Sequence, residues 1–466
     1  MAEKTMTEQL KDQLLFSTEN GGQTLTAEQL QQADAYAEEY KVFLDNAKTE
    51  REAVKMAVEL AQAHGFREFD RASPLKVGDK VYVNNRGKAL LLAVIGEKPI
   101  TEGVSIAAAH IDSPRLDLKP NPLYEDSDLA YFDTHYYGGI KKYQWTAIPM
   151  ALHGVVVKKD GSTMDVCIGD GPNDPVLCVT DLLPHLGQEQ MKRTAAEVVK
   201  GEDLNLLIGS RPLPDGEGSD LVKLRILQLL NEKYGMVEAD FLSAELYAVP
   251  AFQARDVGLD RSMIGSYGHD DRVCAYPALT ALFENEHPAY TAVTVLADKE
   301  EIGSEGNTGM QGAFLPYFID DLAAAFGAQG RHVLSNSVCL SADVNAACDP
   351  IYPEVMLKSN ACQLNRGVCI TKYTGSRGKY DTSDASAEYM ASIRRLLDDN
   401  NVLWQIGELG KVDAGGGGTV AKYIAKLDVD TVDLGVPVLS MHAPFEVVSK
   451  IDVWMAHKAF SALFGR

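Results

Sequence analysis

Two adjacent glutamates, Glu300 and Glu301, lie just beyond the end of an apolar run in the segment LADKEEIGSEGNTG. Charged residues usually lie at the surface, so an isolated pair of this kind is normally an acidic turn. Burying both side chains would be costly unless cations compensate their charge. The pair therefore raises the question of whether other residues supply a metal site.

The same order of apolar strand and then polar residue recurs at three other places. The segment SIAAAHIDS delivers His110, VCLSADV delivers Asp343, and PVLSMHAP delivers His442. Ligands of open α/β sheets bind beyond the carboxyl ends of the strands, so these residues can converge although they lie far apart in sequence. A further acidic pair, Asp270 and Asp271 in SYGHDDRVCAYPAL, precedes a predicted helix.

Two imidazoles and several carboxylates form a ligand set that suits zinc, with cobalt or manganese as alternatives. Two metal ions about 3.5–4 Å apart need a ligand that reaches both, which a carboxylate can do and an imidazole cannot easily do. Asp270 is the candidate bridge, and Asp271 is the alternative to it. Asp112, two residues after His110, is placed to accept a hydrogen bond from the other ring nitrogen.

Such a site would divide the two glutamates between two roles. Glu301 would be a metal ligand, whereas Glu300 would stay unligated, take a proton from an activated water and pass it to a leaving amine. Neighbouring side chains of an extended chain point to opposite sides, so the backbone must bend at EEIG, where Gly303 and Gly306 permit it. Each motif alone is weak, and on chemistry alone a metal site and its absence are evenly balanced.

Strands and helices alternate along most of the chain, which predicts an α/β fold with a mixed, mostly parallel sheet flanked by helices. Apolar residues at helical spacing predict one long helix or two over residues 28–66, ending at Gly65. The segment VGDKVYVNNRGKALLLAVIG predicts a β-hairpin around NNRG.

Composition shifts between about residues 120 and 250, where short strands and a loop-rich section replace the alternation. We predict a discontinuous catalytic domain, residues 1–119 plus 251–466, and an inserted β-rich domain, residues 120–250. Neither part contains an internal repeat or a low-complexity segment.

Charge and composition exclude several function classes. The net charge of −22 disfavours nucleic acid and anionic membranes as partners, because both require a basic surface. No apolar run reaches the length of about 18 residues expected of a membrane span. The N-terminus lacks the apolar core of a signal peptide, so we expect a cytoplasmic protein. The seven cysteines lack CxxC spacing and are interpreted as ordinary core or surface thiols, with Cys348, near the proposed site, as the one candidate exception.

Four motifs in this order and spacing resemble the M18 family of metallo-aminopeptidases, the relatives of aspartyl aminopeptidase: AAHIDSPRLDLKP, DKEEIGSEGNTGMQG, SADV and DLGVPVLSMHAPFEV. The segment YYGGIKKYQWTAIPMALHGVV at the domain junction is also similar, and the resemblance covers nearly the whole chain. It implies a zinc-peptidase fold with two zinc ions per subunit. It also implies that the protein removes the N-terminal residue from short peptides through a water bridged by the two ions.

The resemblance also implies roles for individual residues. One ion would be held by His110, Asp270 and Asp343, the other by Asp270, Glu301 and His442, and Glu300 would be the general base. The family usually has one Asp followed by Asn, so Asp270 and Asp271 remain alternatives. The position before the following helix favours Asp270.

Two loops complete the expectations that come from the resemblance. In DLLPHLGQ, His185 would reach the active site of a neighbouring subunit, with residues 120–250 as a dimerisation domain and a dodecamer built from dimers. In TGSRGKYDTSDAS, Arg377 and Lys379 would pair with an acidic side chain or with the peptide carboxylate. The preferred N-terminal residue of the substrate stays open.

Two alternatives stand beside the aminopeptidase. A related metal-dependent deacylase would use the same site on N-acyl amino acids. A non-catalytic binding protein would still self-assemble into a shell of subunits but would not hydrolyse peptides.

The glycine run in VDAGGGGTVAKYIA is of a kind that binds phosphate in other proteins. It lacks the pattern of a nucleotide site, so we expect backbone close to the active site instead.

Overall fold

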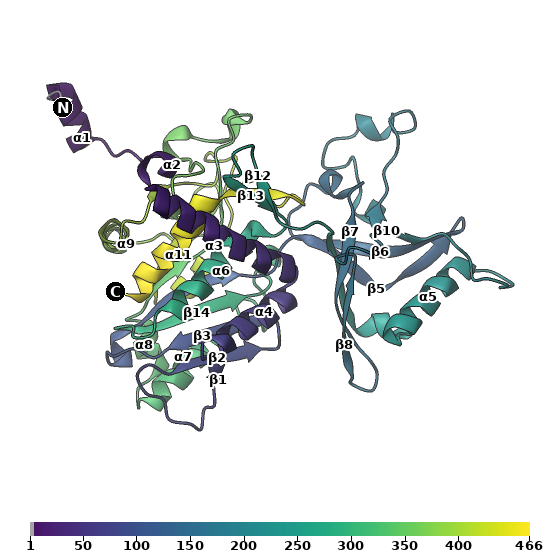
Figure 1. The fold of residues 1–466 in the computed structure, drawn as a ribbon, viewed down its shortest axis with the longest axis horizontal. Helices are drawn as coiled ribbons and strands as arrows, with labels where there is room; N and C mark the ends of the chain where they lie inside the picture. The colour runs from purple at the N-terminus through teal and green to yellow at the C-terminus, as the bar shows by residue number, and fades with distance from the viewer. Residues whose placement is uncertain (1–3) are drawn as a thin grey trace.

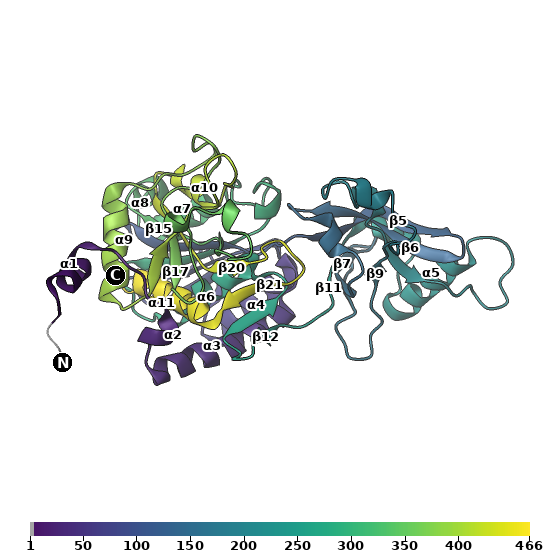
Figure 2. The same ribbon diagram turned by 90° about the horizontal axis from the view of Figure 1, so that it is seen from above.

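The computed structural model describes residues 4–466. The chain forms two lobes that lie side by side in both ribbon views (Figures 1 and 2). The larger lobe contains a nine-stranded sheet, a five-stranded sheet and most of the helices, whereas the other is built around a seven-stranded sheet. Within residues 4–466, no helix combines the length and the apolar character needed to cross a membrane. The predicted α/β class is confirmed.

The nine-stranded sheet has the order β1-β2-β3-β14-β4-β15-β19-β17-β18. Its strands are β1 (Arg67–Glu68), β2 (Lys80–Asn85), β3 (Ala89–Val94), β4 (Val104–His110), β14 (Thr291–Ala297), β15 (Val338–Ser341), β17 (Val368–Thr371), β18 (Trp404–Ile406) and β19 (Asp430–Gly435). The central strands β14, β4, β15 and β19 are parallel. Their carboxyl ends therefore meet at one edge, where Ala297 of β14 lies opposite His110 of β4.

Helices cover both faces of this sheet. One face packs against α3 (Ala27–Asn46), α4 (Glu50–Ala63), α6 (His269–Glu284), α9 (Ala387–Asp399) and α11 (Lys450–Phe464). The other packs against α7 (Phe314–Ala325), α8 (Gly330–Leu334) and α10 (Ala421–Ala425). In β4, Ala107 and Ala109 belong to the first core and Ile106 and Ala108 to the second. Burial on both faces explains why these strands are continuous apolar runs.

The predicted N-terminal helices and hairpin are both confirmed. Residues 28–66 form two helices, α3 and α4, and each begins with a capping box, at Thr26 and Thr49 respectively. Gly65 follows α4 with a φ of 84°, a left-handed conformation that favours glycine. Strands β2 and β3 pair antiparallel, as a hairpin requires.

The second lobe is an antiparallel sheet of order β8-β7-β11-β5-β6-β10-β9 with one long helix. The elements are β5 (Arg115–Asp126), β6 (Leu129–Tyr137), β7 (Met150–Val157), β8 (Thr163–Ile168), β9 (Cys178–Val179), β10 (Leu206–Gly209), α5 (Leu221–Tyr234) and β11 (Ala244–Pro250). Its core is separate and contains the fully buried Trp145. In Figure 1 this lobe lies to the right of the larger one.

A small sheet borders the carboxyl edge of the nine-stranded sheet. It contains β12 (Arg255–Val257), β13 (Met263–Ser266), β21 (Glu446–Ser449), β20 (Pro437–Leu439) and β16 (Asn345–Ala346), in that order. His442 lies between β20 and β21, so its strand belongs to this sheet and not to the parallel one. Asp343 lies between β15 and β16 and connects the two sheets.

The remaining elements are short or peripheral. Helix α1 (Met6–Leu14) projects away from the larger lobe and is followed by α2 (Gly21–Thr24) (Figure 2). The 3₁₀ turns are Ile100–Glu102, Lys142–Trp145, Gln190–Lys192, Gly201–Asp203, Glu238–Ser243, Glu300–Ile302, Pro353–Val355 and Lys358–Asn360.

Ion pairs join the lobes at the start of α4. Glu50 accepts hydrogen bonds from Arg115 Nη1 (2.9 Å) and Tyr247 Oη (3.0 Å) of the second lobe. Glu245 of β11 pairs in turn with Lys88 (2.7 Å) and Arg51 of the larger lobe. The charges of Glu50 and Arg115 are both buried, so each compensates the other at the junction.

Candidate metal centre

Three parallel strands deliver acidic and imidazole side chains to one edge of the sheet. His110 is the last residue of β4, Glu300 and Glu301 follow β14, and Asp343 follows β15. Because β14, β4 and β15 are adjacent, these side chains come together. His442 reaches the same point from the neighbouring five-stranded sheet.

A sharp bend places Glu300 and Glu301 on the same side of the chain. Lys299 takes a left-handed conformation with φ 66°, a 3₁₀ turn spans Glu300–Ile302, and Gly303 closes it with φ 99°. The backbone N–H groups of Glu300 and Glu301 donate to the two oxygens of Asp112, each at 3.1 Å. The Asp112 carboxylate therefore fixes the bend that brings both glutamates to one cavity.

Asp112 also lies beside the ring of His110. The backbone oxygen of Asp112 lies 3.0 Å from His110 Nδ1, and its carboxylate Oδ1 lies 3.4 Å away. The second carboxylate oxygen accepts a hydrogen bond of 2.8 Å from Tyr137 Oη. These contacts direct the Nε2 atom of His110 into the site.

Asp270 lies between the two histidines. Its Oδ1 atom is 3.1 Å from His110 Nε2, and its Oδ2 atom is 3.1 Å from His442 Nε2. The neighbouring Asp271 points elsewhere, where its Oδ2 atom accepts a hydrogen bond of 3.3 Å from the backbone N–H of His110. Of the two adjacent aspartates, only Asp270 faces both imidazoles.

Two further carboxylates complete two groups of three ligand atoms. Asp343 Oδ1 lies 3.7 Å from His110 Nε2, and Glu301 Oε2 lies 3.6 Å from His442 Nε2. The groups are His110, Asp270 and Asp343, and Asp270, Glu301 and His442. Glu300 is in neither group, although its Oε2 atom lies 4.0 Å from His110 Nε2.

The donor set and its electrostatics fit two divalent cations. In tetrahedral zinc sites, nitrogen and oxygen ligands lie about 3.3 Å apart, close to the Asp270–histidine distances. Among residues 4–466, Asp270 Oδ1 and Glu301 Oε1 are buried and have no hydrogen-bond partner. Burial, with the charge of Asp343, raises the pKa of Glu300 to about 8. Burial likewise raises the pKa of Glu301 and of Asp343. Cations would offset this excess of buried negative charge.

Three supporting residues were not identified from the sequence. Glu446 accepts hydrogen bonds from the backbone N–H groups of His442 (2.7 Å) and Asp270 (3.0 Å). The backbone oxygen of Gly139 accepts from His442 Nδ1 at 2.7 Å, and Tyr137 contacts Asp112. Glu446 lies four residues after His442 in HAPFEV, and Tyr137 and Gly139 lie in YYGGIKKYQW. Their place in these family-like segments was the available signal.

A cavity of about 520 Å³ opens onto these residues. Arg377, Lys379 and the glycines 415–418 line it together with the carboxylates, so the glycine run does lie at the site. Lys379 Nζ lies 2.8 Å from Asp384, and this ion pair compensates much of the lysine's positive charge. Arg377 forms no ion pair within residues 4–466 and keeps its charge available.

His185 lies outside this cavity. It is an exposed residue in a turn of the second lobe, and it is not among the described residues that line the cavity. The structure of a single chain therefore does not bring His185 to the other predicted site residues.

Comparisons with known proteins identify the family of the chain. The family model described as aminopeptidase I zinc metalloprotease (M18) matches residues 43–464. A probable M18 family aminopeptidase 1 from Clostridium acetobutylicum is 49% identical over 461 residues, covering 97% of this chain and 99% of that protein.

Two solved structures are similar over nearly the whole chain. The M18 family aminopeptidase from Thermotoga maritima superposes with a TM-score of 0.93 at 44% identity, covering 97% of this chain and 99% of the other. Aminopeptidase I from C. acetobutylicum gives a TM-score of 0.91 at 46% identity, covering 97% and 100%. The chain belongs to the M18 family of zinc metalloproteases and is an aminopeptidase, a hydrolase.

Proposed function

We propose that this aminopeptidase uses a dinuclear zinc centre to remove the N-terminal residue from short peptides, with Glu300 as the general base. The observation that carries the proposal is the position of Asp270, whose two oxygens each lie 3.1 Å from a different histidine. A carboxylate in this position can serve two ions at once, which an imidazole cannot easily do.

Five side chains would hold the metal. His110, Asp270 and Asp343 would ligate one ion and Asp270, Glu301 and His442 the other. The absence of sulfur ligands and the mixture of nitrogen and oxygen favour zinc, with cobalt or manganese as substitutes. Bound ions of this kind lower the pKa of water and polarise a carbonyl group.

Glu300 is the residue that would move the proton. Its carboxylate lines the cavity and belongs to neither ligand group, so its oxygens remain free to accept a proton from the attacking water. It would then donate that proton to the amine that leaves when the peptide bond breaks. Asp112 would hold Glu300 in place through the backbone of the bend.

The cavity would select substrates by charge and by size. Arg377 and Lys379 line the cavity and would attract a carboxylate of the peptide or of an acidic N-terminal side chain. Backbone N–H groups near the glycines 415–418 would donate hydrogen bonds to the substrate or to the developing oxyanion. The volume of about 520 Å³ is within the range of small-ligand sites.

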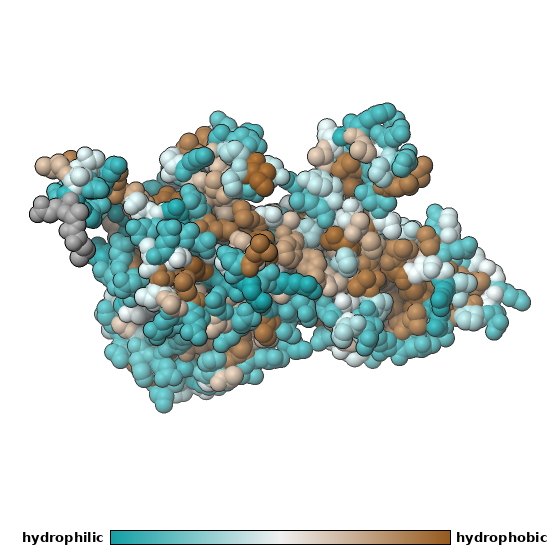
Figure 3. Space-filling model, turned by 45° about the horizontal axis from the view of Figure 1, so that its top comes forward, coloured by the Kyte–Doolittle hydropathy of each residue, from teal (hydrophilic) through white to brown (hydrophobic). Residues whose placement is uncertain are grey.

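Residues 120–250 would form the dimerisation domain of the discontinuous two-domain chain, with residues 1–119 and 251–466 as the catalytic domain. Hydrophobic surface is exposed on the second lobe (Figure 3). Its exposed apolar side chains include Val176, Leu182, Leu183, Leu186 and Met191. A surface of this kind is typical of an interface between protein chains.

Dimers of this kind would assemble into a dodecamer. The mApe1 protein of Saccharomyces cerevisiae, which has the same fold at 22% identity and a TM-score of 0.75, is a dodecamer. In such an assembly, His185, which lies in the exposed apolar loop, would enter a neighbouring active site, and a closed shell would admit only short peptides.

One comparison separates this function from its rivals. Purified protein is assayed on matched substrates with a free or an acylated amino terminus, before and after exhaustive chelation, with zinc, cobalt or manganese added back. Metal-dependent release of the first residue from free-amino substrates alone supports the proposal. Cleavage of the acylated substrates would make the protein a deacylase. Hydrolysis that resists chelation would exclude the metal mechanism. Protein that binds no metal and stays inactive after zinc, cobalt or manganese is added would indicate a binding protein.

A further inference from the structure

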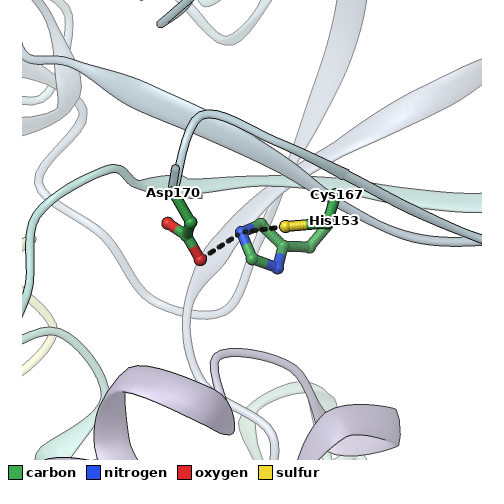
Figure 4. Close-up of side chains that lie close together, drawn as sticks. All are labelled: His153, Cys167 and Asp170. Atoms are coloured by element: carbon green, nitrogen blue, oxygen red, sulfur yellow. Dashed lines mark hydrogen bonds and ion pairs between the residues drawn. The ribbon is translucent and has the colours of Figure 1, made fainter. Parts of the chain in front are cut away.

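A second cluster of metal-ligating side chains lies in the other lobe, outside the candidate active site. His153 of β7 and Cys167 of β8 are directly opposite each other in the antiparallel pair, and Asp170 follows β8. All three side chains point toward one another (Figure 4). One ligand atom from each lies within 4.8 Å of the other two. None of these residues lines the cavity of the active site.

The three atoms are spaced much as the ligands of a tetrahedral metal ion are. His153 Nε2 lies 3.1 Å from Asp170 Oδ2 and 4.0 Å from Cys167 Sγ. Zinc–ligand bond lengths predict separations of about 3.3 Å for nitrogen and oxygen and about 3.6 Å for nitrogen and sulfur. Cys167 is exposed, so rotation of its side chain can bring Sγ the remaining few tenths of an ångström closer to His153 Nε2.

The surrounding residues orient the ring as they would in a metal site. His153 Nδ1 donates to Glu52 Oε1 at 2.7 Å, which leaves Nε2 directed at Cys167 and Asp170. A carboxylate on the far ring nitrogen is the usual partner of a histidine that ligates zinc. Lys48 Nζ binds the other oxygen of Asp170, Oδ1, at 2.6 Å and leaves Oδ2 free.

The thiol of Cys167 has no other role in the structure. Within residues 4–466, its only hydrogen-bond contact is the long one to His153. It is therefore available as a thiolate ligand, whereas Cys178 of the same lobe donates its S–H to the backbone oxygen of Val179 at 3.3 Å. Sulfur, nitrogen and oxygen together favour zinc over magnesium or calcium.

We propose that His153, Cys167 and Asp170 form a separate metal site for one zinc-like divalent ion, open to solvent at its fourth position. Glu52 and Lys48 come from the larger lobe and His153 and Asp170 from the second, so the ion brings both lobes into one network at their junction. The ion would displace the protons of the Cys167 thiol and of His153 Nε2.

Cobalt(II) provides a probe that separates this site from the active site. The candidate active site contains no sulfur ligand, so a sulfur-to-cobalt charge-transfer band in the near ultraviolet can arise only from a cysteine site. Metal-free full-length protein is titrated with cobalt, and bound metal is counted after gel filtration. We expect the band to rise to saturation and to account for one equivalent per chain.

Four variants decide the outcome. Cys167→Ser should lose the band and one equivalent of metal, and His153→Gln should do the same. Cys178→Ser, which removes a thiol from the same lobe, should keep both. Glu52→Gln should keep the band and bind cobalt about 10–100-fold more weakly, because a glutamine has one acceptor oxygen for the two donors that Glu52 now serves, His153 Nδ1 and the backbone N–H of Thr49.

The comparison between wild type and Cys167→Ser is independent of how many ions the active site holds. If the wild-type protein shows no charge-transfer band, or if Cys167→Ser retains the band and the same metal content, the proposed site does not exist. The cluster is then a network of ion pairs in which an imidazolium lies between Glu52 and Asp170.

Discussion

The Oδ1 atom of Asp270 lies 3.1 Å from Nε2 of His110, and this oxygen is buried without a hydrogen-bond partner among residues 4–466. An asparagine at this position would turn an amide N–H₂ toward one of the two imidazoles and remove the bridging charge. The candidate metal centre of Asp270→Asn should therefore bind zinc at least about 100-fold more weakly, and the variant should hold at least one ion fewer per chain than the wild type. Metal analysis after dialysis against buffered zinc measures both effects.

Asp271→Asn is the matched control, because it makes the same chemical change one residue away. Asp271 receives the backbone N–H of His110, and burial raises the pKa of its carboxyl group well above the usual range. A neutral amide at this position resembles the protonated acid, so the metal content per chain should equal that of the wild type. Equal metal loss in the two variants would contradict the assignment of the bridge to Asp270.

Glu300→Gln tests the proton-transfer role. The substitution keeps size and hydrogen bonding but removes the base, so kcat should fall by about 10²–10⁴-fold while zinc content is unchanged. Glu305→Gln is a suitable control, because Glu305 is an exposed residue of the following loop and not among the residues that line the cavity. A Glu300→Gln enzyme with full turnover would require another base.

Glu446→Gln tests a positioning role that acts through the backbone. The two oxygens of Glu446 accept the N–H groups of His442 and Asp270, and a glutamine would present an amide N–H₂ to one of these donors. Zinc should bind about 10–100-fold more weakly, and excess zinc should restore kcat. A loss of kcat that persists at saturating zinc, as expected for Glu300→Gln, would contradict a role in positioning the ligands.

Local sequence patterns predicted the residues at strand ends because a buried parallel strand is a continuous apolar run and the polar residue after it is conspicuous. His110, Glu301 and Asp343 follow this rule. The same pattern could not reveal that His442 follows a strand of another sheet, because short apolar strands have the same sequence pattern in both sheets. Which residues pair across sheets depends on tertiary packing.

Backbone geometry limited the remaining predictions. Asp270 and Asp271 are adjacent at the start of α6, and both have non-helical dihedral angles, so side-chain directions there do not follow from helical or strand periodicity. Glu446 accepts a hydrogen bond from the backbone N–H of Asp270, and Gly139 accepts one from His442 through its backbone C=O. Nearly every residue carries these backbone groups, so the residue types give no sign of the contacts. Such contacts leave no pattern of residue types.

Arg377 and Lys379 both line the cavity, but they differ in how far their charge is already compensated. Lys379 pairs with Asp384 at 2.8 Å and lies over the ring of Tyr373, 3.7 Å from its centroid, whereas Arg377 has no ion pair within residues 4–466. Arg377→Met should therefore raise KM about tenfold for peptides that carry an acidic side chain, the loss expected for one charged hydrogen bond. Neutral peptides should change little.

Lys379→Met provides the matched comparison, since it removes a cation from the same loop. Its effect on KM should be clearly smaller, because Asp384 already screens the charge that is removed. In both variants kcat should be nearly unchanged, as expected when an interaction holds substrate and transition state equally. Steady-state kinetics on paired acidic and neutral aminoacyl substrates measure this. A larger KM effect for Lys379→Met than for Arg377→Met would mean that the Asp384 pair opens when substrate binds and that Lys379, not Arg377, holds the carboxylate.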